Sequence, residues 1–397
     1  MTKRNSIPPM KEEFAAYRRE LHQNPGLMYE EHFSKEMVEK KLSEWGIPFR
    51  AGLGKTGIVA IIEGQKNTSG KTIGIRADMD ALPIEEASNQ PWASKTKGLM
   101  HACGHDGHTA TLLGVAKYLK ETRNFNGRAI LIFQPAEEGG RGAFAMMKDG
   151  LFEGDLKCDA VYAYHNWPYQ PIGTAGIRSG AIMASVDNFD IAITGRSGHA
   201  AYPHNCIDPV MIGASLVTQL QSIVARNVPP QECAVLSVTN FNAGTGAYNI
   251  IPDTAKITGT VRTLSPATRD LVEARMKTIC EEVGKTHNAK IDFHYDREID
   301  PTINDARHTD IIADAAARVL GNENVYRDIE PSMGGEDFGG MLAKVPGAYI
   351  RIGQGVPGKD SPHNRGLHNS GFDFNDDILP IAIDVFVEVI ESQLPLE

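Results

Sequence analysis

Apolar residues recur along the first part of the chain at two different spacings. Stretches in which they return every three or four positions predict helices over residues 10–22, 33–45, 108–119 and 142–148. Short runs rich in β-branched residues predict strands over residues 57–63, 72–76, 128–133 and 159–164. Because strands and helices alternate here, we expect crossover connections and a mostly parallel sheet with helices on both faces.

The order of predicted elements changes near residue 180. The pattern there predicts strands over residues 186–194, 234–241, 251–262 and 290–295, with helices over 208–224 and 265–285. This β-α-β-β-α-β order is typical of a ferredoxin-like domain. A helix, a strand and a helix over residues 309–320, 348–352 and 378–392 then resume the first pattern. We therefore expect an α/β fold with a mixed, mostly parallel sheet in a discontinuous larger domain, 1–182 and 297–397, and an inserted ferredoxin-like α+β domain, 183–296.

Composition excludes several classes of protein. The 397 residues correspond to two or three domains at roughly 150 residues each, and 41% hydrophobic residues can bury a large core. The formal net charge of −10, from 50 acidic and 40 basic residues, argues against a general nucleic-acid binder. No apolar run approaches the ~20 residues of a membrane span.

The N-terminal residues and the cysteines bear on the compartment. Residues 1–9, Met-Thr-Lys-Arg-Asn-Ser-Ile-Pro-Pro, lack the apolar stretch of a signal peptide. The five cysteines are odd in number and scattered, so they do not form a disulfide framework. We expect a reducing, cytoplasmic setting.

Residues 100–108, Met-His-Ala-Cys-Gly-His-Asp-Gly-His, hold three histidines, a cysteine and an aspartate, although the whole chain has only 13 His and 5 Cys. They precede a predicted helix, and Gly104 and Gly107 permit a tight turn. From such a turn Cys103 and His105 could bind one metal ion, or two neighbouring ones. Two alternatives are a helix start with incidental histidines and a Cys103 nucleophile with a histidine base.

Two adjacent carboxylates follow the predicted strand 128–133, in Gln-Pro-Ala-Glu137-Glu138. Neighbouring residues at a strand end point to opposite sides, so one carboxylate could bind a cation while the other carries a proton. The alternative is a solvated loop without a role. The end of a buried strand in an α/β sheet favours a ligand site.

Three further polar groups lie at strand ends or in loops. Asp78 and Asp80 follow the strand 72–76 and can share one face, although aspartate before Pro83 is also a turn former. His165 ends another predicted strand, and His368 lies in a polar loop before the last helix. Each is weak evidence alone, but the strand ends and loops described so far together offer Cys, His and Glu side chains, and this combination indicates one site.

Nine blocks of this sequence resemble those of the dinuclear-metal aminoacylases and hippurate hydrolases, relatives of carboxypeptidase G and of the plant auxin-conjugate hydrolases. The blocks are residues 18–25, 76–85, 101–108, 134–140, 165–168, 195–209, 249–252, 334–338 and 367–369. The His-Ala-Cys-Gly-His-Asp and Pro-Ala-Glu-Glu motifs are specific in combination, and the resemblance covers nearly the whole chain.

The resemblance implies a metal-binding catalytic role for the larger domain. The residues that match the family's ligands for two divalent metal ions are Cys103, His105, Glu138, His165 and His368. Glu137 matches the general base and acid, and Asp80 matches the aspartate that supports the metal site. Asp78 stands where many relatives carry a metal-binding histidine, a departure that fits the branch with a ligand cysteine.

The resemblance also implies that the inserted domain is a lid and dimerisation domain. His199 matches a histidine that reaches across a dimer into the partner's active site. Asn249 and Arg262 match polar contacts to the substrate. We therefore expect a homodimer or a dimer-based oligomer that binds a small molecule, and neither nucleic acid nor a membrane.

The implied activity is hydrolysis of the amide bond of N-acyl amino acids, with hippurate-like substrates favoured by residues 165–168 and 179–189. Manganese or zinc is the expected metal, and nickel or cobalt also suits such ligands. One alternative is a deacetylase of N-acetyl-diaminopimelate or of another N-acetyl amino acid. Others are a metal-independent cysteine hydrolase and a non-catalytic metal or peptide binder, in which Glu137 would have no role.

Overall fold

An eight-stranded mixed sheet forms the centre of the first of two units in the computed structural model, which describes residues 4, 7–358 and 360–397. This first unit consists of the described residues up to Ile182, Ile303–Glu330 and Asp337–Glu397. The second unit consists of Met183–Thr302 and Pro331–Glu336. The chain therefore leaves the first unit for most of the second, returns at Ile303, and enters the second unit once more over Pro331–Glu336.

The strand order of the large sheet is β1-β2-β4-β3-β5-β16-β6-β15. These strands are β1 (Phe49–Leu53), β2 (Gly57–Glu63), β3 (Thr72–Asp78), β4 (Arg128–Gln134), β5 (Ala160–Pro171), β6 (Ala175–Gly176), β15 (Val325–Tyr326) and β16 (Gly347–Gly355). The central strands β4, β3, β5 and β16 run parallel, whereas β1 and β2 pair antiparallel at one edge. The carboxyl ends of β4, β3 and β5 therefore meet at the same end of the sheet. A separate short pair joins β7 (Gly180–Met183) and β14 (Thr302–Asn304).

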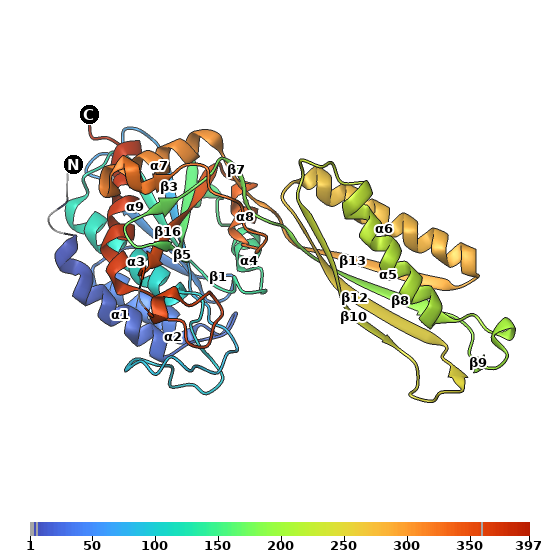
Figure 1. Ribbon diagram of the computed structural model, residues 1–397. Helices are drawn as coiled ribbons and strands as arrows, with labels where there is room; N and C mark the ends of the chain where they lie inside the picture. Colours follow the sequence, from blue (N-terminus) through green and yellow to red (C-terminus); the bar gives the residue numbers. More distant parts are fainter. Residues whose placement is uncertain (1–3, 5–6, 359) are drawn as a thin grey trace. The chain divides into compact units, whose positions relative to one another are not determined.

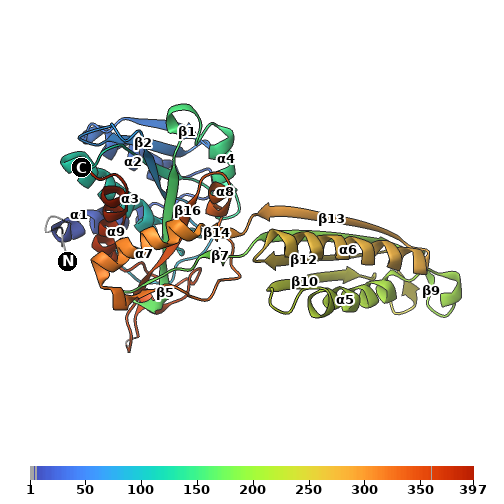
Figure 2. The ribbon, with the colours of Figure 1, turned by 90° about the horizontal axis from the view of Figure 1, so that it is seen from above.

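Helices lie on both sides of the central strands (Figure 1). They are α1 (Lys11–Gln23), α2 (His32–Glu44), α3 (His105–Thr122), α4 (Gly142–Lys148), α7 (Ala306–Leu320), α8 (Phe338–Leu342) and α9 (Leu379–Gln393). Figures 1 and 2 place α1, α3 and α9 on one side of β5 and β16, with α4 and α8 on the other. Because α3 packs against α1, α9 and the sheet, most of its side chains are buried. This burial fixes the start of α3 at the end of the sheet.

The second unit is a four-stranded antiparallel sheet with the order β10-β12-β8-β13. Its elements are β8 (Val186–Thr194), β9 (Gly198–His199), α5 (Pro209–Arg226), β10 (Ala234–Ala243), β11 (Ile250–Ile251), β12 (Thr254–Thr263), α6 (Pro266–His287) and β13 (Lys290–Ile299). Both helices pack on one face, where Phe189, Ile191 and Ile193 of β8 are buried against them. This order of strands and helices is that of a ferredoxin-like fold.

The predicted fold class, α/β with a mixed sheet and a ferredoxin-like insertion, is confirmed. Three predicted elements differ in detail. The strand expected over residues 159–164 continues to Pro171 as β5. The strand expected over residues 251–262 divides at Pro252, which has no N–H to donate to a ladder, so β11 pairs with β9 and β12 with β8. The helix expected to begin at 108 begins at His105, which places part of the histidine cluster on its first turn. Among the described residues, no helix combines the length and apolarity that a membrane crossing requires.

Candidate metal centre

The candidate ligands come from five segments of the first unit. Cys103 lies in the turn before α3, His105 is the first residue of α3, and His165 lies on β5. Glu138 follows β4, and His368 lies in the loop before α9. Since β4, β3 and β5 are adjacent and parallel, their carboxyl ends deliver these segments to one place.

Two ligand sets share the Cys103 thiol. The Sγ of Cys103 and ring nitrogens of His105 and His165 lie within 4.8 Å of one another, and all three residues are buried. The same spacing relates Cys103, the Glu138 carboxylate and His368. The structure thus brings together all five residues that the sequence predicted as ligands. Two overlapping groups of three, joined by one soft sulfur ligand, are compatible with two neighbouring cations.

Hydrogen bonds hold two of the histidines with one ring nitrogen toward the centre. His105 Nδ1 donates to the backbone oxygen of Asp80 at 2.9 Å, and His165 Nδ1 donates to that of Asn166 at 2.7 Å. His105 Nε2 is buried and makes no hydrogen bond within the described part of the chain. His165 Nε2 lies 3.3 Å from Cys103 Sγ. Fixing Nδ1 in this way leaves Nε2 for a metal ion, as is usual for metal-binding histidines.

The turn before α3 is shaped by a glycine. Gly104 has a φ of +103°, and a Cβ placed there would lie 2.2 Å from Oδ1 of Asn166. A side chain at this position would therefore need both a strained backbone and a displaced Asn166. Gly104 lets Cys103 and His105, on either side of it, approach the same centre.

Asp80 supports the ligands on two sides. Its Oδ2 accepts the backbone N–H of Glu138 at 2.9 Å, and its backbone oxygen accepts from His105. Asp80 does not belong to either ligand set. Its contacts suit an aspartate that orients ligands, the role that the family resemblance implied.

Asp78 is bound to protein groups instead. Its Oδ1 accepts from His108 Nδ1 at 2.6 Å, and its Oδ2 accepts from Arg76 Nη1 at 2.7 Å. His108 Nε2 in turn lies 2.7 Å from Oδ1 of Asn166. At position 78 the aspartate forms ion pairs with Arg76 and His108, and it also lies with His105 and His108 in a further group of possible metal ligands. Sequence reasoning did not assign roles to Arg76, His108 or Asn166. The contacts of His108 and Asn166 do not follow from local spacing, whereas Arg76 and Asp78 lie two positions apart on one strand, a spacing that indicates their ion pair.

The charges around the centre change the proton affinities of its histidines. Burial alone would lower the pKa of His105, but the negative charge of Asp78 raises it well above its usual range. Hydrogen bonds to Cys103 and Glu138 raise the pKa of His368 to about 10. Burial, reinforced by His108, lowers the pKa of His165 well below its usual value. Negative groups thus act on His105 and His368 in particular, and divalent cations would balance their charge.

These observations test whether metal ions fit. The donors are one thiol, three imidazoles and a carboxylate, which together suit borderline divalent transition metals. His105 Nε2 makes no hydrogen bond to any described residue and lies 3.7 Å from Asp78 Oδ2. His368 Nε2 lies 3.0 Å from Glu138 Oε1, so both nitrogens face acids that could share a cation with them. The residues present fit two divalent metal ions.

Glu137 and Glu138 reach the same side, contrary to the alternation expected of a strand end. Carboxylate oxygens of both lie within 4.8 Å of each other and of a His105 nitrogen. The reason is that β4 ends at Gln134 and Ala136 takes a φ of +52°, so the following residues are not extended. Glu137 is 8% exposed. A second carboxylate is thus available at the centre beside the ligand Glu138.

The remaining predicted site residues belong to the second unit. His199 is exposed on β9, where it pairs with Ile250 of β11, and the backbone oxygen of Asn249 accepts from Ala200. His199 and Asn249 therefore lie next to each other in the second unit. Arg262 lies apart from them on β12, where burial lowers the pKa of its guanidinium.

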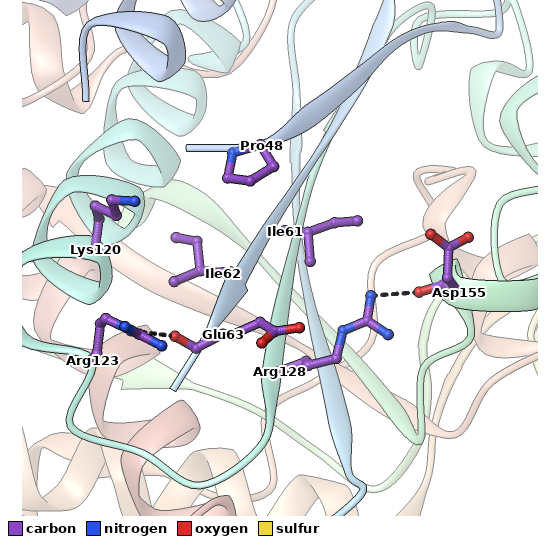
Figure 3. Close-up of a pocket in the computed structure, with 8 residues that line it drawn as sticks. All are labelled: Pro48, Ile61, Ile62, Glu63, Lys120, Arg123, Arg128 and Asp155. Atoms are coloured by element: carbon purple, nitrogen blue, oxygen red, sulfur yellow. Dashed lines mark hydrogen bonds between the residues drawn. The ribbon is translucent and has the colours of Figure 1, made fainter. Parts of the chain in front are cut away.

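A different part of the first unit contains a cavity of about 570 Å³ (Figure 3). Its polar groups are engaged with backbone oxygens: Lys120 Nζ donates to Gly46, Arg123 Nε to Glu63, and Arg128 Nη2 to Asp155. No histidine or cysteine lines it. This cavity therefore offers no histidine or cysteine to a metal ion, and none of its lining residues belongs to the candidate centre.

Comparisons with known proteins agree with this geometry. Residues 74–392 match the model of peptidase family M20/M25/M40. The chain is 40% identical to a hippurate hydrolase of Campylobacter jejuni over 95% of both chains. It is 41% identical to an N-acetyl-L-cysteine deacetylase of Bacillus subtilis, over 88% of this chain and 82% of the relative. A crystal structure of a dinuclear metal binding peptidase from the M20 family, also from Bacillus subtilis, superposes with a TM-score of 0.84 at 33% identity, covering 98% of this chain and 99% of the other.

Proposed function

Because the chain belongs to peptidase family M20/M25/M40, we propose that it is a metal-dependent amidohydrolase that cleaves N-acyl amino acids into a carboxylic acid and a free amino acid. The observation that carries this proposal is the convergence of Cys103, His105, Glu138, His165 and His368 around a second carboxylate, Glu137. A purely structural metal site would fill its coordination shell with ligands and has no use for an additional buried acid.

The five convergent residues are the proposed ligands of two divalent cations. Manganese or zinc is our first choice, and nickel or cobalt also suits this set, because Cys103 favours softer metals while imidazole and carboxylate accept harder ones. Two cations held here would lower the pKa of a water molecule and polarise the carbonyl group of the amide.

Glu137 is the proposed general base and acid. Its carboxylate lies beside His105 and Glu138, within reach of a water molecule at the centre. It takes a proton from the attacking water and returns it to the nitrogen of the leaving amine. Asp80 orients Glu138 and His105 through the contacts described above and does not itself exchange protons.

Residues 183–296, which make up most of the second unit, are the proposed lid and dimerisation domain, and 1–182 with 297–397 are the proposed catalytic domain. We assign His199 to the stabilisation of the oxyanion in the partner's active site. Asn249 and Arg262 are the proposed contacts to the substrate, Arg262 by pairing its positive charge with the substrate carboxylate. These assignments require a homodimer or a dimer-based oligomer. The free cysteines of the described chain support a cytoplasmic setting.

Two acyl classes are supported by specific relatives. A bulky, hippurate-like acyl group is the first candidate, since the hippurate hydrolase of Campylobacter jejuni aligns over 95% of this chain. An acetyl group is the second, since the N-acetyl-L-cysteine deacetylase of Bacillus subtilis is equally similar in sequence. Both reactions use the same centre and differ in the space that the acyl group needs.

A hydrolysis screen tests the proposal. Metal-free protein is reconstituted with one metal at a time and incubated with benzoyl, acetyl, long-chain acyl and indoleacetyl amino acids, and the released amino acid is quantified. We expect turnover that disappears on chelation and returns with metal. Turnover that survives complete chelation would support a Cys103 nucleophile instead. Metal binding without hydrolysis of any substrate would refute the enzymatic assignment.

A further inference from the structure

Arg18, on the third turn of α1, has a fully buried guanidinium that hydrogen-bonds to two acids distant in sequence and lies 3.7 Å from a third, Asp376. Its Nε donates to Oδ2 of Asp106 at 2.8 Å, and its Nη2 donates to Oδ1 of Asp373 at 2.6 Å. The exposed fraction of the three side chains is 0% for Arg18, 0% for Asp106 and 2% for Asp373. A charged group held this deep is costly unless it is fully paired.

Both acids adjoin candidate ligands of the metal centre. Asp106 directly follows His105 on the first turn of α3, and Asp373 lies on the loop that follows His368. The same two segments are joined nearer the centre by a backbone hydrogen bond from His368 to Ala102, 2.8 Å long. Through Asp106 and Asp373, Arg18 therefore links the two segments that bring Cys103 and His368 into one ligand set.

The two segments also pack closely. A Cβ at Gly107 would lie 2.2 Å from the ring of Phe374, so the absence of a side chain at Gly107 lets this ring rest against α3. The Arg18 guanidinium lies 5.6 Å from the centre of the same ring. A shift of either segment would thus change both the ring packing and the ion pairs.

His22, one turn after Arg18 on α1, completes the arrangement. Its Nδ1 donates to the same Asp106 oxygen at 2.7 Å, and its Nε2 lies 3.2 Å from Glu86. Trp92 donates from Nε1 to Asp373 at 3.0 Å. The carboxylate of Asp106 is thus held from two directions, and that of Asp373 likewise. The orientation of each acid, and with it the backbone of each segment, is restricted.

We propose that Arg18, assisted by His22, is a positioning residue for the metal centre, because it sets the separation of the two segments that carry Cys103 and His368. The proposal rests on the proposed function only in that the centre binds metal. The planar guanidinium is needed because it addresses two carboxylates at once, whereas the single ammonium of a lysine cannot reproduce both contacts in the same geometry.

The first test compares Arg18→Lys with Arg19→Lys. Arg19 is the matched control, because its side chain is 40% exposed and pairs with Asp376 instead of with Asp106 or Asp373. Metal affinity is measured by competition with a chromophoric chelator, and ligand geometry by the absorption of Co²⁺ bound to the protein, including its sulfur-to-metal band. We expect Arg18→Lys to weaken metal binding about 10- to 100-fold and to alter the Co²⁺ spectrum. Arg19→Lys should have the same metal affinity and the same Co²⁺ spectrum as the unchanged protein.

The unfolding of the metal-free proteins separates positioning from general stability. If Arg18→Lys lowers the unfolding temperature of the metal-free protein but leaves metal affinity and the Co²⁺ spectrum unchanged, Arg18 is structural only and the proposal is overturned. These readouts do not depend on hydrolysis. A protein that binds metal but cleaves no substrate would refute the proposed function without affecting this result.

Two variants of His22 keep the proposal testable if Arg18→Lys does not fold. In His22→Asn the amide nitrogen takes the place of Nδ1 and can still donate to Asp106, whereas in His22→Gln it takes the place of Nε2 and faces Glu86. We expect His22→Gln to weaken metal binding and His22→Asn to recover most of the affinity. Unchanged affinity in both variants, or an equal loss in both, overturns the role of the contact to Asp106.

Discussion

Glu137 and Glu138 are adjacent in sequence and reach the same centre, yet their surroundings differ. The backbone N–H of Glu138 is held by Asp80, and its carboxylate lies 3.0 Å from His368 Nε2. Glu137 appears with His105 in one cluster but in neither of the two sets that contain Cys103. Binding of metal and transfer of protons should therefore be separable by substitution at these two positions.

We expect Glu137→Gln to retain the metal content of the unchanged protein while kcat falls by roughly 10²- to 10⁴-fold, because an amide cannot carry the proton. Metal content by elemental analysis and steady-state kinetics check this. Glu138→Gln is the matched control, and it should lose metal together with activity. Full turnover in Glu137→Gln would remove this residue from the mechanism.

His22 gives a prediction of pH dependence. Burial disfavours its charged form, but the negative charge of Asp106 outweighs this and raises the pKa of His22 above its usual value. Because folding raises this pKa, protonated His22 stabilises the folded state. The contribution is complete below the pKa of the unfolded state, about 6.5, and is lost as the pH rises through the higher pKa of the folded state. The free energy of unfolding of the metal-free protein should thus fall over this range relative to that of His22→Gln. Urea unfolding at several pH values measures the difference, and parallel curves for the two proteins would contradict it.

For single residues, the sequence indicated the candidate ligands better than the residues that hold those ligands in place. The density of His and Cys around Cys103 marks a site because such residues are rare in the chain. Arg18 gave no comparable signal, because its partners, such as Asp106, are brought close only by folding. Arg76 differs, since its partner Asp78 lies two positions away on the same strand. Arg18 was noticed only as part of a block shared with a family, without a role.

Helix starts in the second unit are fixed by single side chains. The carboxylate of Asp208, at the N-cap of α5, accepts from the backbone N–H groups of Val210 and Met211. Ser265 caps α6 by accepting from the backbone N–H of Thr268. Such caps satisfy donors that have no partner within the helix.

We expect Asp208→Ala to lower the free energy of unfolding of the second unit by about 1 kcal/mol, because the cap donors lose their acceptor. Asp190→Ala is the control in the same unit, since Asp190 forms only an exposed ion pair with Lys256. Exposed pairs contribute little, so a change within about 0.5 kcal/mol is expected there. Chemical unfolding monitored through a probe in this unit compares them, and equal losses would argue against the capping role.

Elements with long, regular apolar patterns were predicted well, and short ones were not. The periodic helices and most strands that enter the sheet centre match their expected positions to within a few residues, but β5 continues to Pro171, well beyond its expected end at residue 164. The two-residue strands β6, β9 and β15 were not predicted, because they exist through pairing with distant partners and have no pattern of their own. The apolar pattern over residues 251–262 continues past Pro252, so it does not indicate that the strand is divided into β11 and β12 there.

All proposed metal ligands belong to the first unit, which also contains the three tryptophans of the chain, Trp45, Trp92 and Trp167. Removing metal should lower the temperature at which tryptophan fluorescence reports unfolding. Metal present at 100 times its dissociation constant contributes about 2.7 kcal/mol to the free energy of unfolding, and its removal takes this contribution away. The second unit is followed by labelling of Cys280, which is buried on α6. Its unfolding temperature should change little with metal, and an equal shift of both signals would contradict the assignment of the ligands to the first unit.

The order of the strands in the large sheet has a consequence for biosynthesis. β16 lies between β5 and β6, yet the ribosome makes it only after the whole second unit, and His368 is made later still. A nascent chain therefore exposes the open edge of β5 and an incomplete set of metal ligands while the inserted unit is already free to fold. Long-range pairing of this kind slows folding and leaves apolar strand edges open to association. Binding of metal by the full set of proposed ligands requires His368, which is made after the second unit and after β16, so it is a late step in the maturation of this protein.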